Sequence, residues 1–379
     1  MNISHFVGLS GIGGVQKNFV EYINYQASID SKLRHKVYTM GAVDYQYKLP
    51  IDVYDIRNPL NLLSLIVDIF SRKKIIHFYN NLTSIKVALF LFFIPVRNLV
   101  IHERGTVWNC PSSHWPLLRF ISWKSDLILA NSNATRLMLI QKFSISKNKI
   151  NVLHNGINTS IECTDIKKNK KSVRVFYIGF IGRLDVPKGV HVLIDAMRHL
   201  SGHHIRLIIA GDGPLERRLQ MQAESLNNVS FVGRVKESDK FLSQLDLLVV
   251  PSIREPLGNV CLEAGLCSVP ILAANVDGIP EIIENHISGE LINPSQVVEI
   301  GNFDNSLLMP EFVINPLSGE LQLPMQINPK LLANKIIDLS MNQKLLSMYA
   351  DNLKTKVISY FNIRRYSLEL SGYYEKLLK

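Results

Sequence analysis

Residues 245–263 read LDLLVVPSIREPLGNVCLE, and this order of residue types decides the fold. The first six residues are mostly Leu and Val, as in a strand that is buried on both faces. Pro251 and Ser252 end the strand, and Pro256 suits the first turn of a helix because its missing N–H needs no partner there. A buried strand, a short turn and a helix together form the repeating unit of a parallel α/β sheet.

The alternation of strands and helices extends in both directions from this stretch. Short β-rich runs predict strands at 3–7, 36–40, 75–79, 98–102, 126–130 and 149–153, then at 174–178, 205–210, 229–232, 245–250 and 271–274. Apolar residues at helical spacing predict helices at 15–23, 62–70, 133–143 and 188–200. We therefore expect two doubly wound α/β domains, with ligands at the carboxyl ends of the strands, in a cleft between the domains.

Three further segments differ in character from this alternation. The lysine-rich stretch at 165–171 has the composition of a linker. Residues 294–327 show little periodicity and several turn residues, so we expect a surface excursion with one hairpin and no assigned chemistry. Residues 328–378 return to a helical pattern that is interrupted near 360–362.

The composition narrows the classes of function. The 379 residues carry a net charge of +10, which suits phosphorylated small molecules, an anionic membrane or plain solubility. Nucleic acid is disfavoured because the basic residues do not alternate with aromatic ones. The four cysteines form no C-x-x-C pair, which argues against zinc and fits a reducing cytosol, and the first residues show no signal-peptide pattern. The apolar run at 87–96 is about half as long as a membrane span, so we expect a buried helix there.

Two glutamates accompany the predicted helix that follows Pro256. Its N-terminal N–H groups, around 257–260, form an anion site, and Gly258 permits close approach of the backbone. Glu255 precedes this helix, and Glu263 is expected about two turns into it. Carboxylates beside a phosphate site are suited to accept hydrogen bonds from sugar hydroxyls. An ordinary electrostatic helix cap is the alternative interpretation.

Other strand ends carry further candidates. Arg183 and Lys188 lie between a predicted strand and a helix, where two cations can stabilise a leaving nucleotide diphosphate without a metal, or simply be solvated charges. The glycine-rich turn at 11–14 either approaches a phosphate or is a tight turn. His102 ends another strand and suits either contact with a sugar or a place in the core. The absence of D-x-D, of G-x-x-x-x-G-K-[ST] and of G-x-S-x-G gives no indication of a carboxylate-held metal, so we expect none.

Taken together, these motifs resemble the retaining glycosyltransferases of family four, which have the GT-B fold. The resemblance covers nearly the whole chain and is strongest over 177–294. The E-x7-E of the family corresponds to Glu255 and Glu263, and its G-R-x4-K to 182–188. Further matches are A-G-x-G at 210–213, Gly13-Gly14, the strand end at 126–132 and Val-Leu-His-Asn-Gly-Ile at 152–157.

The resemblance implies a role for each matched residue. Arg183 and Lys188 would hold the donor pyrophosphate, Glu255 the hydroxyls of the transferred sugar and Glu263 the ribose. Glu255, His102, Arg183 and Lys188 form the expected catalytic set, with His102 near the anomeric centre. The remaining expected donor contacts are Gly14 under the sugar phosphate, the backbone of Leu257, Gly258, Asn259 and Val260, and Gly233, Arg234 and Val235 beside the base.

The chain departs from the family pattern at four positions. Leu257 replaces an aromatic residue, Ser268 a glycine, and Asn158 an aspartate. Asp277 replaces a glycine that lies near the donor sugar in the family, so the resemblance implies that Asp277 bears on the choice of sugar.

The resemblance also implies the domains and the reaction. Residues 1–165 would bind the acceptor and 172–355 the nucleotide sugar, and a helix at 356–379 would return to the N-terminal domain. The expected reaction moves a hexose or N-acetylhexosamine, with retention and without metal, from a nucleotide-diphosphate sugar, with UDP ranked ahead of GDP. The expected acceptor is a saccharide or a lipid-linked glycan in the synthesis of bacterial O-antigen, lipopolysaccharide or capsule.

The sequence also indicates a cellular location and leaves alternative functions open. The basic charge and the apolar helices indicate a cytoplasmic protein at the anionic inner face of the plasma membrane. A nucleotide-sugar 2-epimerase, a phosphorylase and a non-catalytic nucleotide-sugar-binding subunit remain alternatives on the same fold. No site for pyridoxal phosphate is evident, which disfavours a phosphorylase. The intact set of Arg183, Lys188, Glu255 and Glu263 disfavours a non-catalytic subunit.

Overall fold

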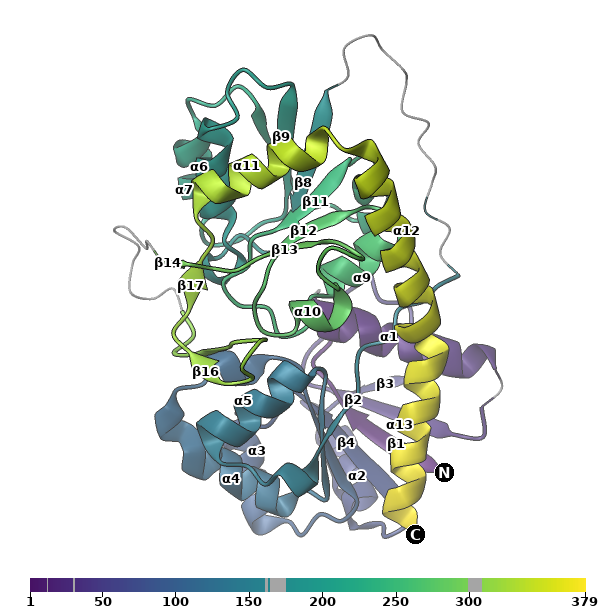
Figure 1. Ribbon diagram of the computed structural model, residues 1–379. Coiled ribbons are helices and arrows are strands. Elements are labelled where there is room, and N and C mark those ends of the chain that lie inside the picture. Colours follow the sequence, from purple (N-terminus) through teal and green to yellow (C-terminus); the bar gives the residue numbers. More distant parts are fainter. Residues whose placement is uncertain (12, 30, 161–162, 164–174, 299–308) are drawn as a thin grey trace. The chain divides into compact units, whose positions relative to one another are not determined.

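The structure is a computed structural model that describes residues 1–379 except 12, 30, 161–162, 164–174 and 299–308 (Figure 1). The chain divides into two compact units. Unit 1 comprises residues 1–158 and 361–379, and unit 2 comprises residues 159–360. The linker expected at 165–171 lies outside the described residues.

Unit 1 contains a seven-stranded parallel sheet in the order β3-β2-β1-β4-β5-β6-β7. The strands are β1 Asn2–Phe6, β2 Arg34–Thr39, β3 Val53–Asp55, β4 Lys74–Tyr79, β5 Leu99–Glu103, β6 Leu127–Ala130 and β7 Ile150–Val152. The α-helices are α1 Gly14–Ser28, α2 Pro59–Phe70, α3 Ile85–Phe93, α4 Trp115–Lys124, α5 Asn133–Phe143 and α13 Ile363–Leu378. β5 and β6 are buried throughout because helices cover the sheet on both faces. The strand order reverses between β1 and β4, and in such sheets that is where ligands bind.

Helix α13 completes the core of unit 1 from the far end of the chain. Tyr366 and Tyr374 are fully buried and pack with residues of α1 and of the sheet. The rings of Tyr366 and Tyr22 meet edge to face with their centroids 5.6 Å apart. The backbone N–H of Ile157 also donates to the carbonyl oxygen of Phe361 at 2.7 Å. Unit 1 is therefore assembled from two stretches of chain that lie more than two hundred residues apart in sequence.

Unit 2 contains a six-stranded parallel sheet in the order β10-β9-β8-β11-β12-β13. The strands are β8 Phe176–Ile181, β9 Ile205–Ala210, β10 Val229–Gly233, β11 Leu247–Val250, β12 Ile271–Ala274 and β13 Glu290–Ile292. The α-helices are α6 Val190–Arg198, α7 Glu216–Ala223, α8 Ser238–Leu242, α9 Asn259–Leu266, α10 Ile279–Ile282, α11 Pro329–Ser340 and α12 Gln343–Tyr360. Here the strand order reverses between β8 and β11.

The prediction of two doubly wound parallel sheets is confirmed, and each predicted strand corresponds to an observed one. The sequence pattern missed β3 and β13, which are three-residue strands at the edges of their sheets. A three-residue strand gives little pattern to recognise, although the equally short edge strand β7, Ile150–Val152, was predicted. The break near 360–362 is confirmed between α12 and α13, and a second break separates α11 from α12.

Two other expectations need correction. In place of the one hairpin expected at 294–327, the described residues of this segment form two small antiparallel ladders, β14 Gln296–Val297 with β17 Met325–Gln326 and β15 Val313–Ile314 with β16 Leu321–Gln322. The helix expected to be buried at 87–96 is α3, and it exposes Leu89, Phe92 and Phe93. Among the described residues, no helix combines the length and the apolar character needed to cross a membrane.

The cysteines also differ from expectation. A disulfide joins Cys163 to Cys267, which the expectation of reduced, scattered cysteines did not include. The two residues are 104 positions apart in sequence, and the fold of unit 2 brings their Cα atoms to 5.2 Å. Cys110 and Cys261 are buried thiols outside this disulfide.

Candidate functional site

The candidate site begins where the strand order of unit 2 reverses. β8 leads into the 3-10 turn η4, Val186–Lys188, and β11 leads into the turn at 251–255. The carbonyl oxygen of Pro187 accepts hydrogen bonds from the backbone N–H groups of Ile253 at 2.8 Å and Arg254 at 3.2 Å. These bonds hold the two turns side by side, so residues far apart in sequence share one edge of the sheet.

Lys188 and Glu255 form an ion pair at this edge. The Lys188 Nζ lies 2.5 Å from the Glu255 Oε2, and their side chains are 25% and 9% exposed. The hydroxyl of Ser252 donates to the same carboxylate oxygen at 3.3 Å. Burial, together with the nearby Glu255 charge, raises the pKa of the Cys261 thiol well above its usual range. Cys261 therefore stays a neutral thiol beside this ion pair.

The backbone around Glu255 is held by Asp277. One carboxylate oxygen of Asp277 accepts from the Glu255 N–H at 2.9 Å, and the other accepts from the Ile314 N–H at 2.7 Å. Gly278 follows directly, and a Cβ there would lie only 2.2 Å from the carbonyl oxygen of Pro256. The turn before α9 and strand β15 are therefore fixed to each other through one side chain. The contribution of Ile314 was not predicted, because the excursion at 294–327 had no assigned chemistry.

The helix at this edge starts later than the sequence indicated. Pro256 does not open it, because α9 begins at Asn259 with Gly258 as its N-cap residue. Gly258 has a φ of 99°, a left-handed conformation that favours glycine. Glu263 is consequently the fifth residue of α9, just over one turn into the helix rather than two. Leu257 and Gly258 are buried, and Asn259, Val260 and Glu263 are half-buried.

The other cations of unit 2 are more exposed. The Arg183 side chain is 70% exposed, and its Nε lies 3.5 Å from the carboxylate of Asp185. Burial raises the pKa of the Asp185 carboxyl above its ordinary value, while Lys188 and two arginines act in the opposite direction. Arg234 follows β10 and lies 4.0 Å from the carboxylate of Asp212. Arg183 therefore shares the strand ends with Lys188 while its guanidinium extends toward solvent.

The two expected donor contacts in unit 1 lie in different environments. Gly14 is the exposed first residue of α1. His102 is fully buried in β5, its ring stacks with that of His77 at 5.6 Å, and neither of its ring nitrogens has a hydrogen-bond partner. Burial lowers the pKa of His102 well below its usual value, and the charge of Arg104 adds to this effect. His102 is therefore neutral, and its contact with a sugar stays a prediction.

The arrangement in unit 2 suits a ligand that combines a diphosphate with hydroxyl groups. Lys188, Arg183 and the N-terminal turn of α9 are suited to phosphate oxygens, and Glu255 is suited to hydroxyl donors. The described residues contain no group of three His, Cys, Asp or Glu side chains that would hold a metal ion.

Two family models match adjacent parts of the chain. The model for Glycosyltransferase Family 4 matches residues 32–161, and the model for Glycosyl transferases group 1 matches residues 162–302. Together they match residues 32–302, and the model for Glycosyl transferases group 1 includes every residue of unit 2 that the sequence predicted for the site.

Curated relatives agree with these matches. An uncharacterised glycosyltransferase of Methanocaldococcus jannaschii is 29% identical over 52% of this chain and 55% of the relative. A capsular polysaccharide biosynthesis glycosyltransferase of Staphylococcus aureus, CapM, is 27% identical over 44% of this chain and 47% of the relative. The matched region thus spans about half the length of these curated relatives.

Solved structures share the fold over the full length. The Anabaena protein HepE in complex with UDP-glucose has a TM-score of 0.75 at 20% identity, covering 99% of this chain and all of that chain. The lipopolysaccharide outer core galactosyltransferase WaaB has a TM-score of 0.66 at 16% identity, covering 99% of both chains. At these identities the similarity establishes the GT-B fold.

Proposed function

The chain belongs to the glycosyltransferases of family 4, and from this membership we propose that it transfers a hexose or N-acetylhexosamine from a nucleotide-diphosphate sugar to a saccharide or lipid-linked acceptor. The observation that carries the proposal is the Lys188–Glu255 ion pair at the strand-order reversal of unit 2. It combines a cation suited to a diphosphate with a carboxylate suited to sugar hydroxyls. The HepE structures with UDP and UDP-glucose support a uridine donor, and the similarity to CapM supports a role in polysaccharide synthesis.

The proposed reaction proceeds with retention of configuration. The acceptor hydroxyl oxygen bonds to the anomeric carbon on the face from which the diphosphate leaves. The bond from that carbon to the diphosphate oxygen breaks, and the hydroxyl proton passes to the departing diphosphate. Arg183, Lys188 and the N-terminal turn of α9 stabilise the negative charge that develops, in the role that a metal ion has in other enzymes.

The remaining residues of unit 2 position the donor in this proposal. Glu255 accepts hydrogen bonds from the transferred sugar, and Glu263 accepts them from the ribose. Residues 233–235 contact the base. Asp277 acts on the choice of sugar through the backbone of Glu255, because it holds the N–H of that residue.

The first test is donor binding followed by transfer. A thermal-shift panel of UDP-glucose, GDP-mannose and ADP-glucose should raise the unfolding midpoint with the uridine donor, since a ligand of the native state stabilises it in proportion to its occupancy. Transfer to candidate acceptors and the NMR coupling constant of the new anomeric proton then establish retention or inversion.

The second test is the substitution Arg183→Ala. Loss of a preorganised group that stabilises developing charge lowers the turnover rate by about 10²–10³-fold. Because the side chain is 70% exposed, the unfolding midpoint should stay unchanged. Arg217→Ala, at an exposed position on α7, is the matched control and should retain full activity. Near-normal transfer by Arg183→Ala would remove Arg183 from the donor site.

We also propose that the protein works at the anionic inner face of the plasma membrane. The net charge of +10 and the exposed apolar residues of α3 support this location. Binding to vesicles that contain phosphatidylglycerol should weaken as salt is raised. The same affinity for vesicles of neutral lipid would contradict the electrostatic part of the proposal.

A further inference from the structure

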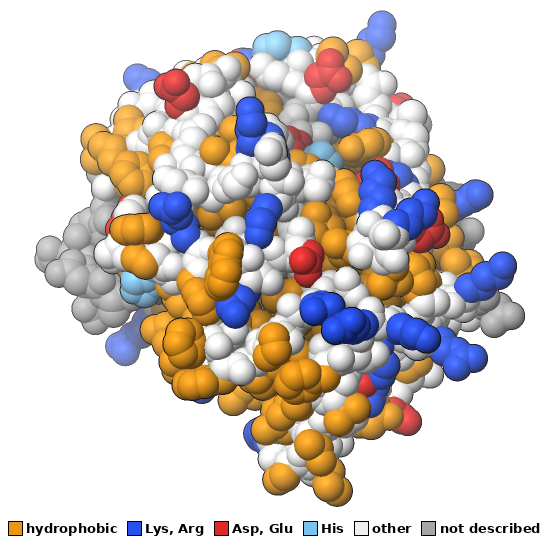
Figure 2. Space-filling model, turned by 90° about the horizontal axis from the view of Figure 1, so that it is seen from below, with side chains coloured by type: hydrophobic (Ala, Val, Ile, Leu, Met, Phe, Trp, Pro, Cys, Tyr) orange, Lys and Arg blue, Asp and Glu red, His pale blue; other side chains and the backbone are white. Residues whose placement is uncertain are grey.

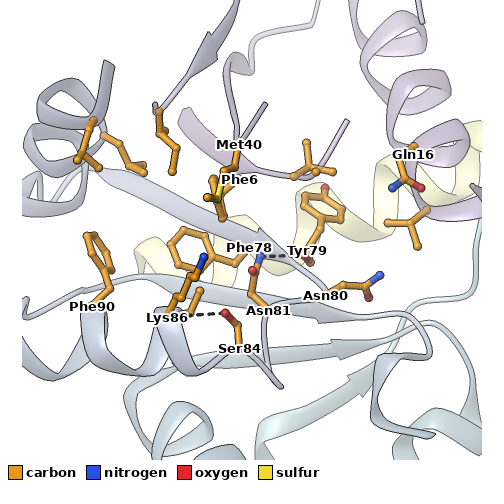
Figure 3. Close-up of a pocket in the computed structure, with 17 residues that line it drawn as sticks. Phe6, Gln16, Met40, Phe78, Tyr79, Asn80, Asn81, Ser84, Lys86 and Phe90 are labelled. Carbon is orange, nitrogen blue, oxygen red and sulfur yellow. Dashed lines mark hydrogen bonds between the residues drawn. The ribbon is translucent and has the colours of Figure 1, made fainter. Parts of the chain in front are cut away.

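A cavity of about 520 Å³ lies in unit 1 where the order of its strands reverses. Phe6 of β1 and Phe78 of β4 line it from the sheet, and Phe90 lines it from α3 (Figure 3). Leu62 lines it from α2. The size is in the range of ligand pockets, and most of the lining residues are apolar. A largely apolar pocket selects a ligand with an apolar part, so a bare saccharide would fit it poorly.

The ammonium group of a lysine, Lys86, lies at this pocket. Lys86 is exposed in the first turn of α3, and its side chain reaches toward Phe78 and Asn81 in Figure 3. Within the described part of the chain, no carboxylate forms an ion pair with Lys86. An exposed ammonium group beside an apolar pocket suits a ligand with a hydrocarbon part and an anionic group next to it.

The two helices beside the pocket are apolar on their outer faces as well. The exposed apolar side chains of α2 and α3 form a surface beside the pocket. Figure 2 shows a face of the molecule on which hydrophobic side chains gather, with Lys and Arg side chains among them. The exposed large apolar residues outside the lining are Leu60, Leu63, Val67 and Phe70 of α2 and Ile85, Leu89, Phe92 and Phe93 of α3. The helix α3 has only nine residues, too few to cross a bilayer, so its exposed face suits the surface of one.

The charges on this surface have one sign. Helices α2, α3 and α4 contain a single acidic residue, Asp68, which is buried and hydrogen-bonded to Ser4 and Tyr38. On α4, which packs against α3, the Arg119 guanidinium lies 5.5 Å from the centre of the Trp115 ring. On the same helix the Lys124 ammonium lies 5.0 Å from the centre of the Trp123 ring. Tryptophans beside basic residues are typical of protein surfaces at the level of anionic lipid headgroups.

We propose that the pocket between α2 and α3 binds the hydrocarbon chain of a lipid phosphate, with Lys86 at its phosphate. This assignment rests on the proposed function, and it narrows the acceptor to a lipid-linked one. The exposed apolar faces of α2 and α3 contact the bilayer, so the chain of the lipid passes into the pocket with little exposure to water.

The test titrates n-decyl phosphate, below its critical micelle concentration, into the full chain by calorimetry. Decyl phosphate should bind, and inorganic phosphate at the same concentration should not. Leu62→Asp should weaken the affinity by about tenfold or more, because it puts a carboxylate beside both the hydrocarbon chain and the phosphate. Lys86→Gln should weaken binding of decyl phosphate but not of decanol, since only the phosphate needs the cation.

The neighbouring residue provides the matched control. Leu63 is on the same helix and 57% exposed, whereas Leu62 lines the pocket and is 37% exposed. Leu63→Asp should leave the affinity for decyl phosphate unchanged and weaken binding to phosphatidylglycerol vesicles. Equal losses of decyl phosphate affinity in both variants would overturn the pocket assignment.

The remaining outcomes separate this proposal from the proposed function. A soluble oligosaccharide acceptor that binds at this pocket while decyl phosphate does not would also overturn the assignment. Donor binding is read independently by the thermal shift with UDP-glucose. A protein that binds decyl phosphate but no nucleotide sugar would refute the proposed function and leave the pocket assignment standing.

Discussion

Replacing Lys188 with methionine tests whether the ion pair with Glu255 organises the candidate donor site. Methionine keeps most of the apolar length of the side chain and removes the charge. The Glu255 carboxylate, only 9% exposed, then loses its cation and keeps the Ser252 hydroxyl at 3.3 Å. Glu255→Gln leaves the converse defect, an ammonium group without its carboxylate.

The expected cost follows from how much of the pair is buried. Removing one partner of a fully buried pair costs about 3–5 kcal/mol because a charge is left without compensation. The Lys188 side chain is 25% exposed, and water and Ser252 relieve part of this cost, so we take about 2 kcal/mol as the expected loss. For a unit of the size of residues 159–360, each kcal/mol lowers the midpoint by about 2–4 °C. Lys188→Met should therefore lower the unfolding midpoint of unit 2 by about 4–8 °C.

Calorimetry on the single and double variants measures this effect. The double variant Lys188→Met with Glu255→Gln should recover much of the lost stability, since no uncompensated charge remains, while transfer activity stays lost. Lys240→Met is the matched control, because Lys240 pairs with Glu237 at 2.9 Å with both side chains about 60% exposed. The Lys240→Met substitution should change the free energy of unfolding by less than about 0.5 kcal/mol. If the Lys188→Met and Lys240→Met variants unfolded at the same midpoint temperature, the Lys188–Glu255 ion pair would not stabilise unit 2 as proposed.

Two further predictions concern the glycine beside the site and the buried histidines. Gly278→Ala should lower the stability of unit 2 and weaken binding of UDP-glucose, because the added Cβ would lie 2.2 Å from the Pro256 carbonyl oxygen. An unchanged dissociation constant for UDP-glucose would contradict this close contact. In unit 1, burial lowers the pKa of His35 to about 4 and holds the pKa values of His5 and His77 well below 6.5. The folded state then binds fewer protons than the unfolded chain between pH 6.5 and 4, so its stability is full above pH 6.5 and falls as the pH drops toward 4. Urea unfolding of unit 1 across this range measures the slope, and a flat profile would show that these histidines titrate normally.

Much of the fold could be predicted because buried parallel strands are rich in aliphatic residues. Both central strands of the unit 2 site, β8 and β11, followed from this pattern. The bounds of α9 did not, because Pro256 gives a local preference, whereas the helix start depends on the left-handed Gly258 and on the close backbone contact at Gly278. Such tertiary contacts override local preference and leave little trace in the pattern of residue types.

The candidate site also contains residues that the sequence could predict and residues that it could not. Lys188 and Glu255 could be predicted as site residues because the carboxyl ends of parallel strands lie at one edge of the sheet, so charged residues there come close together. The hydrogen bond from Ile314 to Asp277 could not, since any residue except proline offers a backbone N–H and 37 positions separate the two. The apolar face of α3 was recognised as hydrophobic but assigned to the interior, because an apolar run alone does not show which side of a short helix meets solvent.

The return of α13 to unit 1 has a consequence for the order in which the chain folds. Tyr366 and Tyr374 fill the same core as α1, so unit 1 lacks part of its interior until residues 361–379 have been synthesised. Unit 2 is continuous in sequence and is complete once Tyr360 has emerged from the ribosome. During translation residues 159–360 can therefore reach their native state before unit 1 does, because residues 1–158, although synthesised earlier, need residues 361–379 to complete their core. Throughout that interval the partly formed unit 1 exposes aromatic surface that a chaperone would recognise.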